Sequence, residues 1–170
     1  MTGSFVTLPR DQPSVRRGLW WRRGLLCLFA AVAIAALLDL FGQQPTDSVA
    51  SSPAATMRLS APKSVRGGLL FQARLEIRAV RTIEEPRLVL DEGWFEGMQF
   101  NSMEPQAESE SPRDGKVVFS YDQLAAGDLL RIWVQFEANP PQVARRSFAI
   151  ELDDATQPLA RIDRDITILP

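Results

Sequence analysis

The residue types that most often carry chemistry in proteins are scarce in this sequence. It has no histidine and one cysteine, Cys27, so zinc and copper(II) sites lack their usual nitrogen and sulfur ligands. The serines are not part of a Gly-x-Ser-x-Gly motif, and there is no histidine to act as their base. We therefore expect no catalytic residue, no metal ligand and no cofactor.

Aspartates near the end of the chain are the remaining metal candidates. Asp153, Asp154, Asp163 and Asp165 offer the oxygen ligands that Ca²⁺ prefers, but the spacing of an EF-hand loop is absent. A solvated loop between strands is the favoured interpretation, and calcium binding stays open. A pair of carboxylates for glycoside hydrolysis also stays open, because only the distance between the two groups in space decides whether they can act together.

Apolar side chains gather in one short stretch that could form either core or interface. Trp94, Phe95 and Met98 belong to a cluster that also holds Phe100 and Met103. Core packing is the favoured role for Phe100 and for one of the two residues Trp94 and Phe95. The other aromatic ring and Met98 are candidates for a binding interface.

Trp133, Arg145 and Arg146 are further candidates for an interface. Trp133 falls on the polar side of an alternating stretch, and an exposed aromatic on a sheet is typical of an interface anchor. The two arginines follow a proline-rich turn and could hold a carboxylate or a phosphate. For the arginines, a solvated basic loop is the simpler interpretation.

Period-two alternation predicts the strands that must position these residues. Residues 69–80 and 129–138 place apolar side chains on one face and polar ones on the other. Residues 104–115 are polar and predict a loop, and 94–100 predicts an irregular or bulged strand. Seven or eight short strands predict an all-β, antiparallel β-sandwich of immunoglobulin type. The other strands are expected at 57–60, 87–91, 116–121, 147–152 and 159–169.

An apolar run precedes the strands and predicts one transmembrane helix over residues 24–42. Its central part, 25–41, carries a single charge, Asp39, and reaches about 25 Å at about 1.5 Å per residue. Arginines and paired tryptophans lie on its N-terminal side, as expected for a cytoplasmic flank. The flanking residues are Arg16, Arg17, Trp20, Trp21, Arg22 and Arg23.

This anchor divides the chain into four predicted parts. We expect 1–23 to be a cytoplasmic tail, 24–42 to cross the cell membrane once, 43–56 to be a flexible linker, and 57–170 to form the extracytoplasmic sandwich. Cleavage of the apolar segment as a signal peptide stays open, because small residues follow it.

A stripe of the predicted helix has the spacing of a helix-packing face. Cys27, Ala31, Ala35 and Asp39 are four residues apart, and the first three are small enough to admit a neighbouring helix. We expect either a partner helix on this stripe or, in the simpler interpretation, a plain anchor.

Three stretches of the outer part carry a resemblance. GWFEGMQFNSMEP (93–105), LAAGDLLRIWVQF (124–136) and ELDDATQPLARIDRDITILP (151–170) resemble a family of uncharacterised bacterial single-pass membrane proteins with an immunoglobulin-like outer domain. The resemblance covers residues 57–170. It implies the fold and the membrane topology, and no activity.

These features predict a membrane-anchored accessory module without catalytic activity that docks on another membrane or envelope protein. The alternative is a module that binds a small molecule or a cell-wall glycan through exposed aromatic rings. Residues 58–170 hold 14 basic and 18 acidic residues, so we expect no nucleic-acid partner. The partners expected are the lipid bilayer and a protein.

Overall fold

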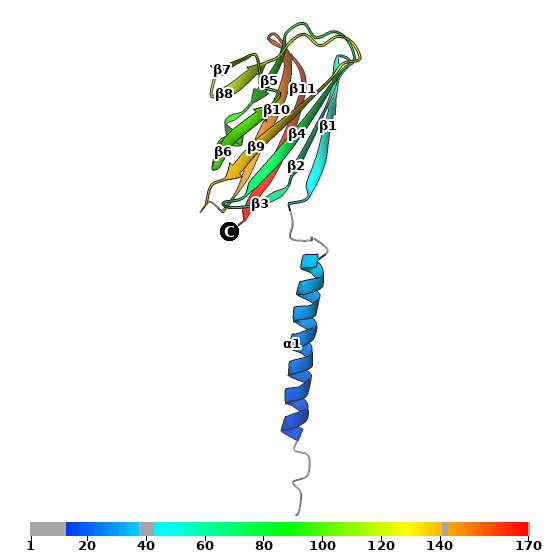
Figure 1. Cartoon of the computed structure of the whole chain (residues 1–170), viewed down its shortest axis with the longest axis vertical. Helices are drawn as coiled ribbons and strands as arrows, with labels where there is room; N and C mark the ends of the chain where they lie inside the picture. Colours follow the sequence, from blue (N-terminus) through cyan, green and yellow to red (C-terminus); the bar gives the residue numbers. More distant parts are fainter. Residues whose placement is uncertain (1–12, 38–42, 141–142, 170) are drawn as a thin grey trace, which may run out of the picture. The chain divides into compact units, whose positions relative to one another are not determined.

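The computed structural model describes residues 13–37, 43–140 and 143–169. The chain forms two compact units, one up to Gly42 and one from Gln43 onward. Within the described residues the first unit holds one helix, and the second holds eleven strands in two sheets (Figure 1). The predicted all-β sandwich preceded by one apolar helix is confirmed.

Helix α1 (Pro13–Leu37) begins earlier than the predicted span and covers its residues 24–37. The segment Leu19–Leu37 is long and apolar enough to cross a membrane, and none of its residues is fully buried. A signal sequence has the same properties, so the membrane and the orientation of the chain stay predictions. Residues 38–42 of the predicted span lie outside the described residues.

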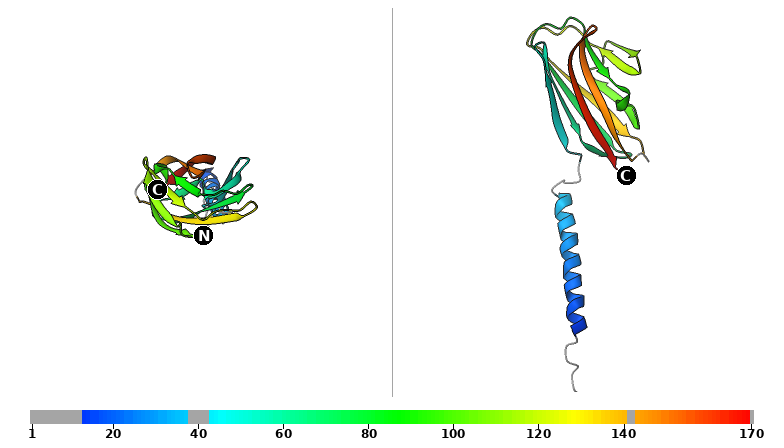
Figure 2. Two further views of the ribbon diagram at one scale, coloured as in Figure 1. Left: turned by 90° about the horizontal axis from the view of Figure 1, so that it is seen from above. Right: turned by 180° about the vertical axis from the view of Figure 1, so that it is seen from behind.

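Sheet A has the strand order β1-β2-β4-β9-β6 and is antiparallel throughout. Sheet B has the order β3-β11-β10-β5-β8-β7 and is antiparallel except where β3 pairs with β11. The sheets face each other as two layers (Figure 2). The strands of sheet A are β1 (Pro45–Ser51), β2 (Ala55–Pro62), β4 (Leu70–Ala79), β9 (Leu129–Ala138) and β6 (Met98–Glu104). Those of sheet B are β3 (Ser64–Arg66), β11 (Gln157–Leu169), β10 (Ala144–Asp154), β5 (Pro86–Leu90), β8 (Lys116–Ser120) and β7 (Ser109–Arg113).

The core lies between the two sheets and is built by the predicted alternation. In β4 and β9 every second side chain points inward, and the inward residues from Phe71 to Ala79 are at most 5% exposed. Burying one large apolar side chain contributes about 1.5–3 kcal/mol. Trp94 occupies the centre, with its ring 5.1 Å from that of Phe136 and 4.1 Å from that of Phe148.

The predicted flexible linker over 43–56 is wrong where β1 forms, because β1 pairs with β2 along its whole length. Its inward side chains are half-buried and small or polar, so apolar alternation is absent from the sequence. Arg164 of β11 holds the strand in place from the opposite sheet. The buried guanidinium of Arg164 donates to the Thr46 carbonyl (2.7 Å), the Thr46 hydroxyl (2.6 Å) and the Ala61 carbonyl (2.9 Å).

The predicted loop over 104–115 is also wrong in part, because residues 109–113 form β7 and pair with β8. The turn between them is Asp114-Gly115, with φ angles of 51° and 79°. Two successive positive φ angles are what a two-residue hairpin of type I′ requires.

The irregular strand predicted over 94–100 is divided into two elements in the structure. Trp94 lies in the 3₁₀ turn η1 (Glu92–Trp94), and β6 begins at Met98.

Candidate binding site

Trp133 lies in a row of side chains that crosses the outer face of sheet A. The strand registers place Ser60 of β2, Arg74 of β4, Trp133 of β9 and Glu104 of β6 side by side. Trp133 is 37% exposed, and Arg74 beside it lies 4.0 Å from Glu76. An amphipathic ring is therefore presented in the middle of a polar face.

A hollow of about 320 Å³ adjoins the Trp133 ring. Its walls come from β2, β4 and the residues around the start of β1, and they carry hydroxyl, amide and guanidinium groups. We call Ser60, Gln72, Arg74 and Trp133 the Trp133 surface. These groups can donate and accept hydrogen bonds around an aromatic platform, which suits a protein side chain or a sugar ring.

Two of the predicted interface residues belong to the core instead. Trp94 is 1% exposed and Met98 is 4% exposed, so neither is available to a partner. The indole nitrogen of Trp94 donates to the Ala149 carbonyl at 2.8 Å, which fixes the ring under the edge of β10. Phe95 is half-buried and packs against the core. The prediction of an interface at Trp94 and Met98 is therefore wrong.

Arg145 and Arg146 lie in β10 of sheet B, so the structure does not bring them to the Trp133 surface. Arg145 is 2.6 Å from Asp165, and Arg146 is 3.0 Å from Glu96. The hydroxyl of Ser147 and the guanidinium of Arg145 both bond the Asp165 carboxylate and lower its pKa. An external carboxylate or phosphate would have to displace these acidic partners.

The predicted helix stripe is described only in part. Cys27, Ala31 and Ala35 lie on α1 at the predicted spacing, the first two exposed and Ala35 half-buried. Asp39 lies outside the described residues. Nothing else in the described chain shows what covers this stripe, and the partner helix stays a prediction.

The aspartates considered for calcium are engaged by neighbouring groups. Asp153 is 3.0 Å from Arg113, and Asp154 accepts a hydrogen bond from the Glu85 amide at 2.9 Å. Hydrogen bonding from Arg161 lowers the pKa of Asp163. Among the described residues, no group of three or more acids or cysteines is placed to hold a metal ion.

A Ser-x-x-Lys spacing, Ser60 to Lys63, occurs at the end of β2 and was missed in the sequence. In serine enzymes with this motif the lysine lies beside the hydroxyl. Along an extended strand, residues three apart point to opposite faces. The structure shows no hydrogen bond between these two described residues, so we assign them no catalytic role.

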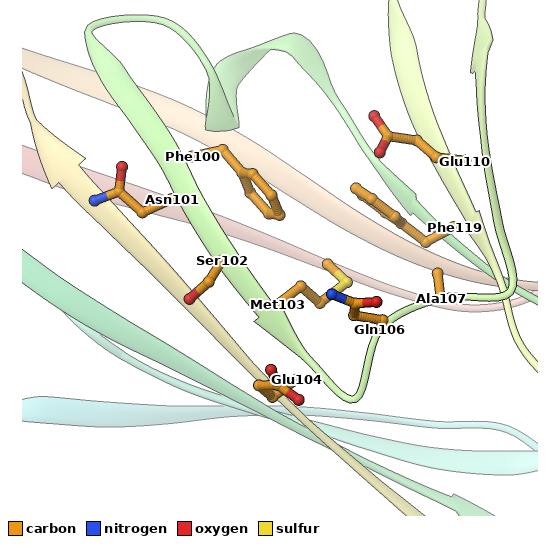
Figure 3. A pocket seen from close by; sticks show the side chains of 9 residues that line it. All are labelled: Phe100, Asn101, Ser102, Met103, Glu104, Gln106, Ala107, Glu110 and Phe119. Atoms are coloured by element: carbon orange, nitrogen blue, oxygen red, sulfur yellow. The ribbon is translucent and has the colours of Figure 1, made fainter.

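A second hollow, also missed in the sequence, lies between β6 and the β7–β8 hairpin (Figure 3). We call it the β6–β7 groove; its volume is about 360 Å³. The Phe100 and Phe119 rings are stacked 6.1 Å apart at its floor, beside Met103. The Tyr121 hydroxyl donates to the Met103 sulfur at 3.0 Å, and burial raises the pKa of Tyr121, so that it stays a donor. The polar lining residues are Asn101, Ser102, Glu104, Gln106 and Glu110.

A β-bulge in β6 shapes this groove. The register with β9 shifts between Phe100 and Ser102, so Asn101 is an additional residue on the edge strand. Without the shift, strict alternation would put Phe100 and Met103 on opposite faces. With it, both line the groove, which is how bulges redirect side chains near binding sites.

Comparison with known proteins supplies no function. No protein-family model and no curated relative match the sequence. Similar solved structures include a CARDB domain from Pyrococcus furiosus, described in complex with di-metal ions; it is 7% identical, with 75% of this chain and 90% of that chain covered and a TM-score of 0.44. A Niemann-Pick type C2 protein from the Japanese carpenter ant is 7% identical, with coverages of 73% and 96% and a TM-score of 0.41. A FixG-related protein from Vibrio parahaemolyticus is 12% identical, with coverages of 61% and 82% and a TM-score of 0.34. At these values the likeness carries no argument about activity, and membership of the bacterial membrane-protein family stays a prediction.

Proposed function

We propose that the chain is a membrane-anchored, extracytoplasmic accessory module without catalytic activity, which docks on another membrane or envelope protein through the Trp133 surface. The observation that carries the proposal is the exposure of Trp133 on an otherwise polar sheet face. Aromatic anchors ringed by polar groups contribute most of the binding energy in many protein interfaces. The apolar helix α1 supports the anchoring, and the absence of histidine supports a role in binding.

The experiment tests docking with a matched pair of variants. Full-length protein in native membranes is cross-linked and its partners are identified, with Trp133→Ala compared with Val49→Ala. Val49 is 55% exposed on the same sheet, away from the Trp133 surface. We expect the main cross-link to fall about tenfold or more in Trp133→Ala, the loss typical of an interface hot spot, and to persist in Val49→Ala. Equal yields in both variants would contradict docking through this surface.

The orientation is tested separately, because it rests on the arginine flank. A reporter that is active only in the cytoplasm, fused after Pro170, should be silent. Activity of that reporter would place the sandwich on the cytoplasmic side and exclude an extracytoplasmic role.

Glycan binding is a second candidate, favoured by the hollow beside the Trp133 ring. Gln72 and Arg74 supply planar hydrogen-bonding groups next to an aromatic platform. In this case the protein should be retained on isolated cell-wall glycan, Trp133→Phe should keep most of the retention, and Trp133→Ala should lose it. Retention that is unchanged in Trp133→Ala would exclude this candidate.

A further inference from the structure

We propose that the β6–β7 groove is a binding site for a small organic cation with an apolar body. The groove and the hollow beside the Trp133 ring are separate, because the groove lies along β6 and the β7–β8 hairpin. Glu104, whose register partner is Trp133, lines the groove and not that hollow. Its volume of about 360 Å³ is within the range of small-molecule sites, roughly 300–1,000 Å³. Phe100, Phe119 and Met103 provide the apolar floor that such sites require.

The charges of the groove select the sign of the ligand. Glu104 from β6 and Glu110 from β7 lie on its two walls, and none of the described residues that line it is an arginine or a lysine (Figure 3). Neither glutamate forms an ion pair or a hydrogen bond with another described residue, whereas the acids on the outer face of sheet B are bonded to arginine and lysine. A cation can therefore be attracted by both carboxylates and can lie against the half-buried ring of Phe100.

The geometry of the groove also decides against an added peptide strand. The bulge at Asn101 interrupts the regular edge of β6. On the other wall, β7 contains Pro112, which has no N–H group to donate. A bulge and a proline each prevent another strand from pairing with the edge of a sheet. The groove therefore suits a compact molecule that does not bind through backbone hydrogen bonds to a strand edge.

The walls are held in place without a ligand, so the site is preformed. Arg113 of β7 is 3.0 Å from Asp153 of β10, whose side chain is 4% exposed, and this ion pair joins the hairpin to the body of sheet B. The stacked rings of Phe100 and Phe119 join the two walls at the floor. A preformed site loses little conformational entropy when it binds a ligand.

The test uses the full chain in a non-ionic detergent and three probes of one shape. Phenethylammonium carries the positive charge, phenethyl alcohol is neutral, and phenylacetate is negative. Binding is measured by calorimetry and by the shifts of methyl and aromatic NMR signals. We expect phenethylammonium to bind most tightly, phenethyl alcohol more weakly and phenylacetate not at all. Equal binding of the cation and the alcohol, or no saturable binding of the cation, would overturn the proposal.

Variants then locate the binding. Glu104→Gln and Glu110→Gln should each weaken phenethylammonium binding by about threefold to fivefold, as expected for a partly solvated charge pair. Glu137→Gln is the matched control, because Glu137 lies on β9 outside the groove, and it should change nothing. Unchanged affinity in both groove variants, or an equal loss in Glu137→Gln, would overturn the assignment.

Discussion

On the side of the sandwich where β1 lies, Arg164 crosses from sheet B and bonds two strands of sheet A. On the other side, β6 and the β7–β8 hairpin face each other (Figure 1), and the hydrogen bond from the Tyr121 hydroxyl to the Met103 sulfur links them without reaching a backbone carbonyl. The first side is closed by hydrogen bonds to the buried carbonyl of Ala61 and the partly buried carbonyl of Thr46. The second side ends in a groove in which the Phe100 ring is half-buried, above the buried side chains of Phe119 and Met103.

The difference shows how one fold separates stability from binding. A buried carbonyl that lacks a donor costs about 1–3 kcal/mol, so the Arg164 side is closed as a condition of folding. The floor of the groove is apolar. Exposing it to water leaves no polar group without a hydrogen-bond partner, so this penalty does not arise there. The second side can therefore stay accessible, and the sandwich tolerates it.

The largest effect is expected where the closed side is opened. Arg164→Met removes the donors to Thr46 and Ala61, and it should lower the free energy of unfolding by about 2–4 kcal/mol. Urea unfolding of the full chain in detergent measures the change. The control is Arg145→Met, which removes an exposed ion pair with Asp165 and should change the free energy of unfolding much less. If the free energy of unfolding fell equally in the two variants, the Arg164 hydrogen bonds would not be what stabilises the β1 side.

A smaller effect is expected when the hairpin of the open side is released. Arg113→Met leaves the buried carboxylate of Asp153 without its cation. Because the Arg113 side chain is 37% exposed, solvent screens the pair, and we expect a loss of about 1–2 kcal/mol. Hydrogen exchange should accelerate in β7 and β8 and stay unchanged in β1 and β2. Faster exchange in β1 would mean that the two sides are coupled.

The floor of the groove should contribute less to stability than its ring size suggests. Phe100 is half-buried, so Phe100→Ala should cost about 1 kcal/mol, against about 3–5 kcal/mol for Phe136→Ala in the core. The unfolding midpoints of the two variants provide the comparison. A loss at Phe100 as large as that at Phe136 would identify the groove floor as ordinary core.

The smallest effect concerns a third covered edge, where Asp91 accepts the Ala149 N–H group at 2.8 Å. Burial raises the pKa of the Asp91 carboxyl above its ordinary value, although the bond from Ala149 opposes the shift. A raised carboxyl pKa gives stability that is present at low pH and is lost as the pH rises through the folded-state pKa. Asp91→Asn removes this loss, so its stability relative to the wild type should rise slightly as the pH increases from about 4, the ordinary pKa of an aspartate. A relative stability that falls over this range would mean that the shift has the opposite sign.

Much of the fold could be predicted because the central strands bury one face. β4 and β9 show period-two alternation, and the ends predicted for β9 agree with the structure. β1 was missed because its stability depends on Arg164, which lies 118 residues from Thr46 along the chain. β7 was missed although Asp114-Gly115 is a hairpin signal, because the strand itself has no large apolar side chain.

The candidate sites could be predicted less well than the strands. The outward position of Trp133 follows from alternation within one strand. Trp94 looked equally suited to an interface, and only the turn η1 and the bond to Ala149 place it in the core. The β6–β7 groove combines a bulge with side chains from three strands. Because sequence patterns are local, they do not reveal such a combination.

The position of the Arg164 hydrogen bonds has a mechanical consequence. The chain that leads from α1 enters the sandwich at the beginning of β1, and Thr46 is the second residue of that strand. If the helix is held in a membrane while the sandwich is bound to a partner, tension along the chain reaches the Arg164–Thr46 bonds before the rest of the β1–β2 ladder. Arg164 then determines the force at which β1 begins to peel from β2.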